Sequence, residues 1–148
     1  MANGVTSKSI GDLISFHTEG SVLTGETTFG NFRVHIYSDS IVKIHASQRD
    51  FPESSYAVIA EPIPGVPYTL SEQADHILLT LQNLKIRINK YPVRFTFIAP
   101  DDRVINEDHH FGTSWIGEQV TTYKRLQENE RFIGLGEKTG PVDKRGMG

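Results

Sequence analysis

Apolar and polar residues alternate with a period of two along several short stretches of the chain, the pattern of β-strands that bury one face. Between Asn31 and Tyr37, for example, the apolar residues Phe32, Val34 and Ile36 occupy every second position. The same alternation predicts further strands at Ile41–Ala46, Ile77–Leu81, Leu84–Ile88, Val93–Ala99 and Val120–Leu126. Weaker alternation predicts three more, at Leu13–His17, Val22–Thr28 and Tyr56–Ala60. No stretch shows a sustained helical repeat, so the pattern predicts an all-β protein.

Turn-forming residues separate the predicted strands. Gln82-Asn83, Tyr91-Pro92 and Pro100-Asp101-Asp102 supply turn chemistry, so the strands between residues 77 and 99 are expected to form a meander. Glu61–Pro67 contains three prolines, which confine it to a loop or a sheet edge. Short strands at close turn spacing favour an antiparallel β-sandwich or barrel. A length of 148 residues fits a single domain, in which the small, polar residues 1–12 are expected to fray.

Charge and composition limit the partners. The formal net charge of −3 provides no basic field, so neither nucleic acid nor a membrane surface is an expected partner. The chain contains no cysteine, which excludes disulfides and thiolate chemistry but suits any compartment. The first twenty residues lack the continuous apolar region of a signal peptide, and no stretch approaches the length of a membrane span. The lack of a signal peptide slightly favours the cytoplasm.

Asp108-His109-His110 is the cluster that could ligate a metal or move protons. Neighbouring residues on a strand point to opposite faces, and no distant third ligand stands at a recognisable spacing. A solvated loop is therefore the preferred interpretation, and neither a metal nor another cofactor is expected. The adjacent carboxylates Asp101-Asp102 and Glu107-Asp108 flank predicted turns, which favours a structural role over the paired carboxylates of glycoside hydrolysis.

Two further features could contact a ligand. Trp115, the single tryptophan, could stack on a sugar ring, although large aromatic side chains more often pack in a core. The segment Arg131–Gly146 is rich in glycine and charge, which suits a loop of unusual backbone conformation. It does not match a phosphate-binding loop, because Glu137 separates the preceding glycine from Lys138.

The end of this segment carries a family resemblance. Its sequence, Gly-Leu-Gly-Glu-Lys-Thr-Gly-Pro-Val-Asp-Lys-Arg-Gly at 134–146, is similar to a signature near the end of the N-terminal domain of glycoside hydrolase family 31, the α-glucosidase and α-xylosidase family. The likeness extends loosely back to Phe32, and it includes the order of strands and Trp115. The chain differs from the residues usual in the family at Ile133, Val142 and Lys144, and these differences are conservative.

The resemblance implies a galactose mutarotase-like supersandwich that packs against a catalytic (β/α)8 barrel of the same parent chain and lends a loop to its active-site rim. In the family, the catalytic aspartates of the retaining reaction belong to the barrel, so no catalytic residue is expected in this chain. The positions that match the signature are Gly134, Gly136, Glu137, Lys138, Asp143 and Arg145. They are expected to shape a connection at residues 134–148 that leads toward the barrel.

The leading hypothesis is therefore a non-catalytic N-terminal domain of an α-glucosidase-type hydrolase that acts on α-linked glucosides or related glycans. Such a domain should expose an apolar patch where the barrel covers it. The alternative is a free-standing carbohydrate-binding β-sandwich that uses Trp115 or Tyr37, and Glu137 and Lys138 are weak candidates for sugar contact. A mutarotase-like epimerase is a third possibility, which would need histidines such as His35, His45 and His110 to converge with a glutamate.

Overall fold

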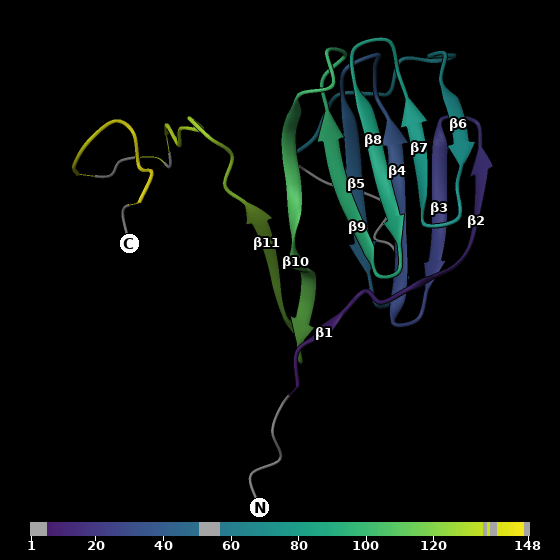
Figure 1. Cartoon of the computed structure of the whole chain (residues 1–148), viewed down its shortest axis with the longest axis horizontal. Coiled ribbons are helices and arrows are strands. Elements are labelled where there is room, and N and C mark those ends of the chain that lie inside the picture. Colours follow the sequence, from purple (N-terminus) through teal and green to yellow (C-terminus); the bar gives the residue numbers. More distant parts are fainter. Residues whose placement is uncertain (1–5, 51–56, 135, 137–138, 147–148) are drawn as a thin grey trace, which may run out of the picture.

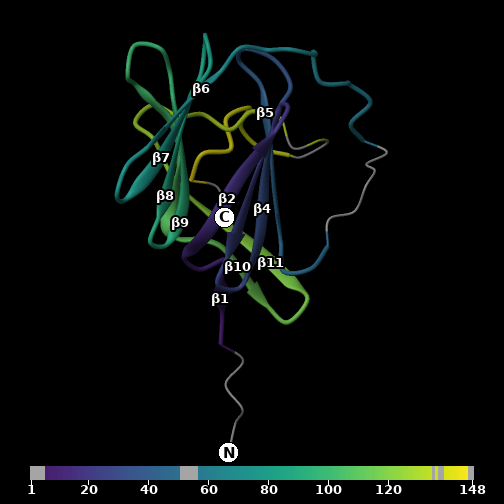
Figure 2. The ribbon, with the colours of Figure 1, turned by 90° about the vertical axis from the view of Figure 1, so that its right-hand side faces the viewer.

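The computed structural model describes residues 6–50, 57–134, 136 and 139–146. Within those ranges the chain forms eleven strands and no helix, arranged as two antiparallel sheets that face each other (Figure 1, Figure 2). The strands are β1 (Lys8–Ser9), β2 (Leu13–Glu19), β3 (Val22–Thr27), β4 (Gly30–Ile36), β5 (Val42–Ser47), β6 (Thr69–Glu72), β7 (His76–Thr80), β8 (Lys85–Lys90), β9 (Val93–Ile98), β10 (Val104–Ile116) and β11 (Gln119–Arg125). The prediction of an all-β antiparallel sandwich is confirmed.

The larger sheet has seven described strands in the order β1-β10-β9-β8-β7-β6, with β11 paired to β10 outside this path. Trp115 of β10 pairs with Lys8 of β1 on one side and with Val120 of β11 on the other. Strand β9 pairs with the earlier part of β10, on the same side as β1. The smaller sheet has the order β2-β3-β4-β5. The β10–β11 hairpin therefore forms one margin of the larger sheet.

The core lies between the two sheets and is almost entirely apolar. Its most deeply buried side chains come from alternate positions of β3, β4, β7, β8 and β9, and they are Leu23, Phe32, Val34, Ile36, Ile77, Leu79, Ile86, Ile88 and Val93. Burial of one such side chain contributes about 1.5–3 kcal/mol. Phe32 of β4 meets Phe95 of β9 edge to face, with ring centroids 5.3 Å apart, so these two strands lie opposite each other across the sandwich.

Most predicted strands are confirmed, with ends that differ by at most two positions. The predicted meander is the β7-β8-β9 unit, its turns fall at the three predicted places, and Glu61–Pro67 is a loop. The strand predicted at Tyr56–Ala60 is wrong for residues 57–60, which form no strand, while Tyr56 lies outside the described residues. The short β6 was not predicted.

The sequence also missed the two strands at the hairpin margin, β1 and β10. Residues 8–12 were expected to fray, but Lys8 and Ser9 pair with β10 and the Ile10 side chain is only 2% exposed. Strand β10 is the longest in the described part of the chain, and its alternation is interrupted at its centre by the irregularity described below. None of the described residues forms a helix with the length and apolarity that a membrane crossing requires.

Candidate functional site

The β10–β11 hairpin carries an unusually large irregularity. Asp108 pairs with Lys124 and Thr113 pairs with Thr122, so five steps along β10 match two steps along β11. The extra residues push the backbone of β10 out of the ladder between these pairs, which is a β-bulge of more than one residue. Gly112, inside this bulge, has a φ of 50°, a conformation that glycine adopts without the strain that a Cβ atom adds.

Aromatic rings gather on this bulge. The His110 ring lies 3.9 Å from the His109 ring and 4.0 Å from the Phe111 ring, and Phe111 lies 5.4 Å from Tyr123 of β11, measured between centroids. Burial and the neighbouring positive charges of His110, Arg125 and Arg94 lower the pKa of His109. Its Nδ1 atom is buried and has no hydrogen-bond partner among the described residues.

Arg94 of β9 packs beneath the bulge. Its Nη1 donates to the carbonyl oxygen of Val93 at 2.8 Å, and its Nη2 donates to the carbonyl oxygen of His110. A Cβ atom on Gly112 would lie 3.0 Å from Nη1. Burial lowers the pKa of the Arg94 guanidinium, an effect that Asp108 partly offsets. Arg94 thus fills the gap that the bulge opens beside β9.

Asp108 anchors the bulge from the interior side. Its side chain is 3% exposed, and its carboxylate accepts the Phe95 backbone N–H at 2.9 Å and the Lys124 ammonium at 2.5 Å. Both partners satisfy an acceptor that would otherwise be buried without a hydrogen bond, a state that carries a large free-energy penalty. The contacts therefore assign Asp108 a structural role.

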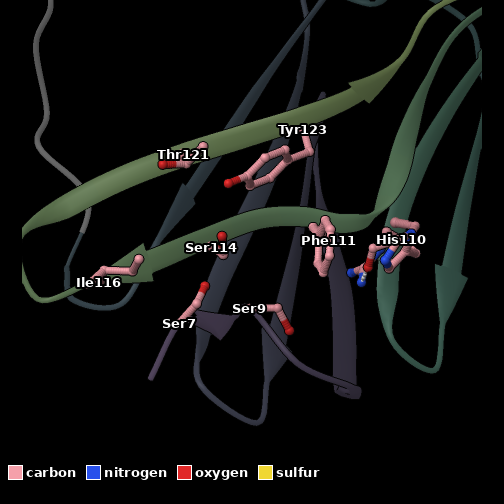
Figure 3. A pocket seen from close by; sticks show the side chains of 9 residues that line it. Ser7, Ser9, His110, Phe111, Ser114, Ile116, Thr121 and Tyr123 are labelled. Carbon is pink, nitrogen blue, oxygen red and sulfur yellow. Dashed lines mark hydrogen bonds between the residues drawn. The ribbon is translucent and has the colours of Figure 1, made fainter. Parts of the chain in front are cut away.

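Two cavities lie against the hairpin, one on each face. The inner cavity, of about 340 Å³, lies between the hairpin and the edge of the smaller sheet, and its walls include Ile44, Phe97, Val120 and Lys124. The outer cavity, of about 390 Å³, lies on the opposite face of the larger sheet. Its walls combine hydroxyl groups with aromatic rings, contributed by Ser7, Ser9, Ser114, Thr121, His110, Phe111 and Tyr123. Figure 3 shows Ser7 and Ser9 on one side of β10, and Thr121 and Tyr123 on the other.

The structure places the Asp108-His109-His110 cluster differently from the expectation of a solvated loop. Asp108, His109 and His110 do not lie in a solvated loop but within β10. The two histidine rings come together because the bulge breaks the alternation on which their predicted divergence rested. Among the described residues, no group of three histidine, aspartate or glutamate side chains could hold a metal ion.

The two carboxylate pairs have different surroundings. Asp101 accepts the backbone N–H of Arg103, and Asp102, with a φ of 67°, contacts Lys85 at 2.6 Å, so the predicted turn role of this pair is confirmed. Glu107 and Asp108 do not flank a turn, because both lie within β10, where Glu107 contacts Arg125 at 3.4 Å. Each of these four carboxylates is thus occupied by a contact within the fold.

Those candidates for sugar contact and epimerase chemistry that the structure describes do not assemble into one site. Trp115 is 7% exposed and belongs to the core, so its ring presents no open face for a sugar. Tyr37 follows β4 and is half-buried. His35 and His45 lie on the smaller sheet whereas His110 lies on the larger one. Glu137 and Lys138 lie outside the described residues.

The glycine-rich segment has the backbone conformation that its composition predicts. Gly134, Gly136 and Gly140 have φ values of 113°, 72° and 103°. An isolated bridge joins Ile133 to Asp143 and closes the loop between them. These glycines therefore supply the positive φ values with which the chain turns back on itself.

Asp143 holds the two ends of this loop together. Its carboxylate accepts the backbone N–H groups of Arg145 and Phe132, both at 3.1 Å, and the Arg131 side chain at 3.2 Å. These bonds lower the pKa of Asp143 below its ordinary value. Arg145 in turn donates to the carbonyl oxygen of Glu130 at 2.8 Å. Two charged residues of the signature thus hydrogen-bond to the backbone of the loop itself.

The described residues form an all-β sandwich with a hydroxyl-rich and aromatic surface at one margin, and such a fold hosts many unrelated functions. A comparison with family models gives the particular family. Residues 31–147 match the glycosyl hydrolase 31 N-terminal galactose mutarotase-like domain. The chain belongs to this family, as the resemblance of its signature predicted.

Known proteins agree with the assignment. Alpha-glucosidase 2 of Bacillus thermoamyloliquefaciens is 29% identical over 143 residues, which are 93% of this chain and 18% of that protein. A GH31 dextranase of Flavobacterium johnsoniae, solved with glucose, superposes with a TM-score of 0.86 at 26% identity, over 94% of this chain and 18% of that one. The cycloalternan-forming enzyme of Listeria monocytogenes, with a TM-score of 0.77 at 17% identity over 95% of this chain and 14% of that one, supports the fold alone. The chain thus spans less than a fifth of these relatives.

Proposed function

We propose that this chain is the N-terminal, non-catalytic domain of a retaining α-glucosidase-type glycoside hydrolase that acts on α-linked glucosides or related glycans. The observation that carries the proposal is the family match over residues 31–147 in a chain that covers only 18% of an alpha-glucosidase and of a dextranase. In this proposal, a catalytic (β/α)8 barrel of the same parent chain supplies the two carboxylates that glycoside hydrolysis requires.

The contacts of the carboxylates support a non-catalytic role. A catalytic acid needs a free carboxyl group near its substrate, and a nucleophile needs an open approach. Asp108 is enclosed by Phe95 and Lys124, and Asp143 is engaged by three donors of its own loop. These side chains stabilise the fold and offer no free group for acid–base chemistry.

The hairpin margin supports the proposed docking of the parent chain. In Figure 1, β11 and the C-terminal segment project beyond the smaller sheet. Apolar side chains in this region are strongly exposed for a folded domain, with Val120 at 57%, Leu126 at 50%, Ile133 at 67% and Val142 at 73%. Exposed apolar groups that gather in one region mark an interaction surface. We assign this projecting surface, together with the inner cavity, to contact with the barrel.

The signature residues have a role in the same proposal. Gly134 and Gly136 turn the backbone, and Asp143 and Arg145 hydrogen-bond to the backbone of the loop. A loop fixed by its own hydrogen bonds reaches a partner domain with little further loss of conformational entropy. We propose that it sets the path of the chain toward the barrel and the rim of its active site.

The experiment that tests this function is hydrolysis of a chromogenic α-glucoside by this chain and by a protein extended through the downstream reading frame. We expect activity in the extended protein alone. Activity in the 148-residue chain would contradict a non-catalytic role, and an extended protein that folds but cleaves no α-glucoside or α-glucan would contradict the proposed substrate class.

A further inference from the structure

We propose that the outer cavity of the β10–β11 hairpin is a binding site for a short, neutral glucan chain. The proposal rests on the proposed function for the identity of the sugar, but the site itself is defined by the residues of this domain. Three observations carry it: a row of hydroxyl groups, a wall of two aromatic rings beside that row, and a guanidinium whose two terminal nitrogen atoms both donate to backbone carbonyl oxygens.

The row of hydroxyl groups follows from the register of three neighbouring strands. Ser9 of β1 pairs with Ser114 of β10, and Ser114 pairs with Thr121 of β11. Residues paired directly across a sheet project from the same face, and neighbouring strands lie about 4.8 Å apart. The three hydroxyl groups therefore span about 10 Å across the sheet, a length that suits one to two sugar units.

These hydroxyl groups are free to bind. The Ser9 oxygen accepts the backbone N–H of Gly11 at 3.2 Å, which leaves its own proton available to a ligand. The side chains of Ser114 and Thr121 make no hydrogen bond within the described part of the chain, although the residue Ser114 is only 6% exposed. Hydroxyl groups that both donate and accept match the hydroxyl groups of a sugar.

The aromatic wall stands beside this row, further along β10 and β11. Phe111 is 54% exposed and Tyr123 is 44% exposed, and Figure 3 shows both rings beside the cavity. A pyranose ring presents C–H groups on its faces, which pack against aromatic rings while its hydroxyl groups remain at the edge. The wall and the row of hydroxyl groups thus complement the two kinds of surface that a sugar carries.

The contacts of Arg94 favour a neutral ligand over an anion. Arg94 also lines the cavity, but its Nη1 and Nη2 atoms donate to backbone carbonyl oxygens and its Nε atom is buried. A Cβ atom on Gly112 would lie 3.0 Å from Nη1, so the absence of a side chain at this position leaves room for the guanidinium. The Arg94 side chain therefore offers no exposed fork of donors of the kind that recognises phosphate or carboxylate.

The test is a titration of the isotope-labelled 148-residue chain with isomaltotriose, followed through backbone amide signals, with inorganic phosphate titrated in parallel. We expect saturable shifts with isomaltotriose at the outer cavity, centred on Ser9, Ser114, Thr121 and Tyr123, and weaker shifts with phosphate. Absence of saturable shifts, shifts spread over both faces of the hairpin, or tighter binding of phosphate at this site would overturn the proposal.

A matched pair of substitutions on neighbouring residues locates the site. Thr121→Val removes a hydroxyl group from the outer face, and Thr122→Val makes the same change on the inner face, where Thr122 contacts Thr113 at 3.2 Å. Valine keeps the shape of threonine and suits a strand, so both variants should fold. We expect several-fold weaker binding for Thr121→Val and unchanged binding for Thr122→Val.

Tyr123→Ala tests the aromatic wall and should weaken isomaltotriose binding about tenfold. Binding that is unchanged in both Tyr123→Ala and Thr121→Val would exclude the outer cavity. Failure of this proposal is distinguishable from failure of the proposed function, because the titration needs no catalytic domain and the hydrolysis experiment needs no binding by this domain.

Discussion

The two halves of the sandwich differ in how they are stabilised. In the closed half, β3 and β4 face β8 and β9, and alternate side chains such as Phe32, Ile86 and Ile88 are completely enclosed. At the hairpin margin, β10 and β11 carry a bulge, half-exposed rings and a buried carboxylate that is neutralised by Lys124. The closed half is stabilised by apolar burial, whereas the hairpin margin depends on polar contacts made in defined places.

The difference indicates how one domain can be both a stable scaffold and an interaction surface. Close-packed apolar layers lose free energy of folding when any side chain is shortened, and they leave no group free to bind. A bulge re-aims side chains and exposes them, and its backbone then needs dedicated partners such as Arg94 and Asp108. We therefore expect substitutions in the closed half to change stability, and substitutions on the hairpin margin to change binding.

The largest difference in the free energy of unfolding should appear when phenylalanine is replaced by alanine in each half. Phe32 is 0% exposed and meets the Phe95 ring, so Phe32→Ala should lower the free energy of unfolding by about 3–5 kcal/mol, since it opens a cavity in a core without free space. Phe111 is 54% exposed, so Phe111→Ala should lower it by about 1 kcal/mol or less. Urea unfolding of both variants measures the contrast, and equal losses would show that the hairpin margin is as tightly packed as the core.

A second comparison concerns two aspartate–lysine pairs. Asp108→Asn should lower the free energy of unfolding by about 1–3 kcal/mol, because its enclosed carboxylate accepts two hydrogen bonds and an amide cannot replace the charge. Asp102→Asn should change it by less than about 0.5 kcal/mol, because the Asp102 side chain is 81% exposed beside Lys85. A loss for Asp102→Asn as large as that for Asp108→Asn would show that enclosure adds nothing to the anchor of the bulge.

Two glycines of the hairpin allow a finer test. Gly112 and Gly117 have similar φ values, 50° and 60°, but only Gly112 faces a neighbour, the Arg94 guanidinium. Gly117→Ala should lower the free energy of unfolding by about 1–2 kcal/mol, because of backbone strain alone. Gly112→Ala should lower the free energy of unfolding by more than this, because the added Cβ atom must also displace Arg94 from the carbonyl oxygen of His110. If thermal unfolding shifts equally in both variants, the Arg94 contact does not stabilise the bulge.

The closed half was predictable from the sequence because a single physical rule determines it. Alternation of apolar residues assigns one face of β4, β7, β8 and β9 to the interior, and the buried residues Phe32, Ile77, Ile86 and Val93 follow that rule. The turns between the strands carry their own signals in proline, asparagine and aspartate. Local pattern and tertiary packing agree in this half, so prediction from the pattern succeeds.

The hairpin margin was not predictable in the same way. Residues 104–116 alternate poorly because the bulge shifts the register at their centre, and no local signal reports a pairing between Lys8 and a residue as distant as Trp115. The outer cavity is assembled from three separate segments, and serine or threonine hydroxyls are too common for their spacing to indicate a site. The histidines of the bulge did stand out as a sequence feature, but their interpretation as a loop failed because β10 pairs with β11 on both sides of them, at Asp108 and at Thr113.

The smallest effect we expect is a loosening of the bulge in mild acid. Burial and the positive charges around it lower the pKa of His109 in the folded chain, so near its ordinary value of about 6.5 the unfolded chain binds more protons at this residue than the folded one. The free energy of unfolding must therefore fall as the pH falls through that value. His110, Arg125 and Arg94 all add positive charge around His109, and none of them can stabilise the protonated ring.

The measurement is a pH titration of backbone amide signals across this range. We expect signals of His109–Gly112 to broaden or shift at a pH where those of the closed half, such as Ile86 and Ile88, do not change. His109→Phe keeps an aromatic ring next to His110 but cannot accept a proton, so it should abolish the change. Persistence of the change in His109→Phe would show that His109 is not its cause, and uniform broadening over both halves would show that the hairpin margin does not open independently of the core.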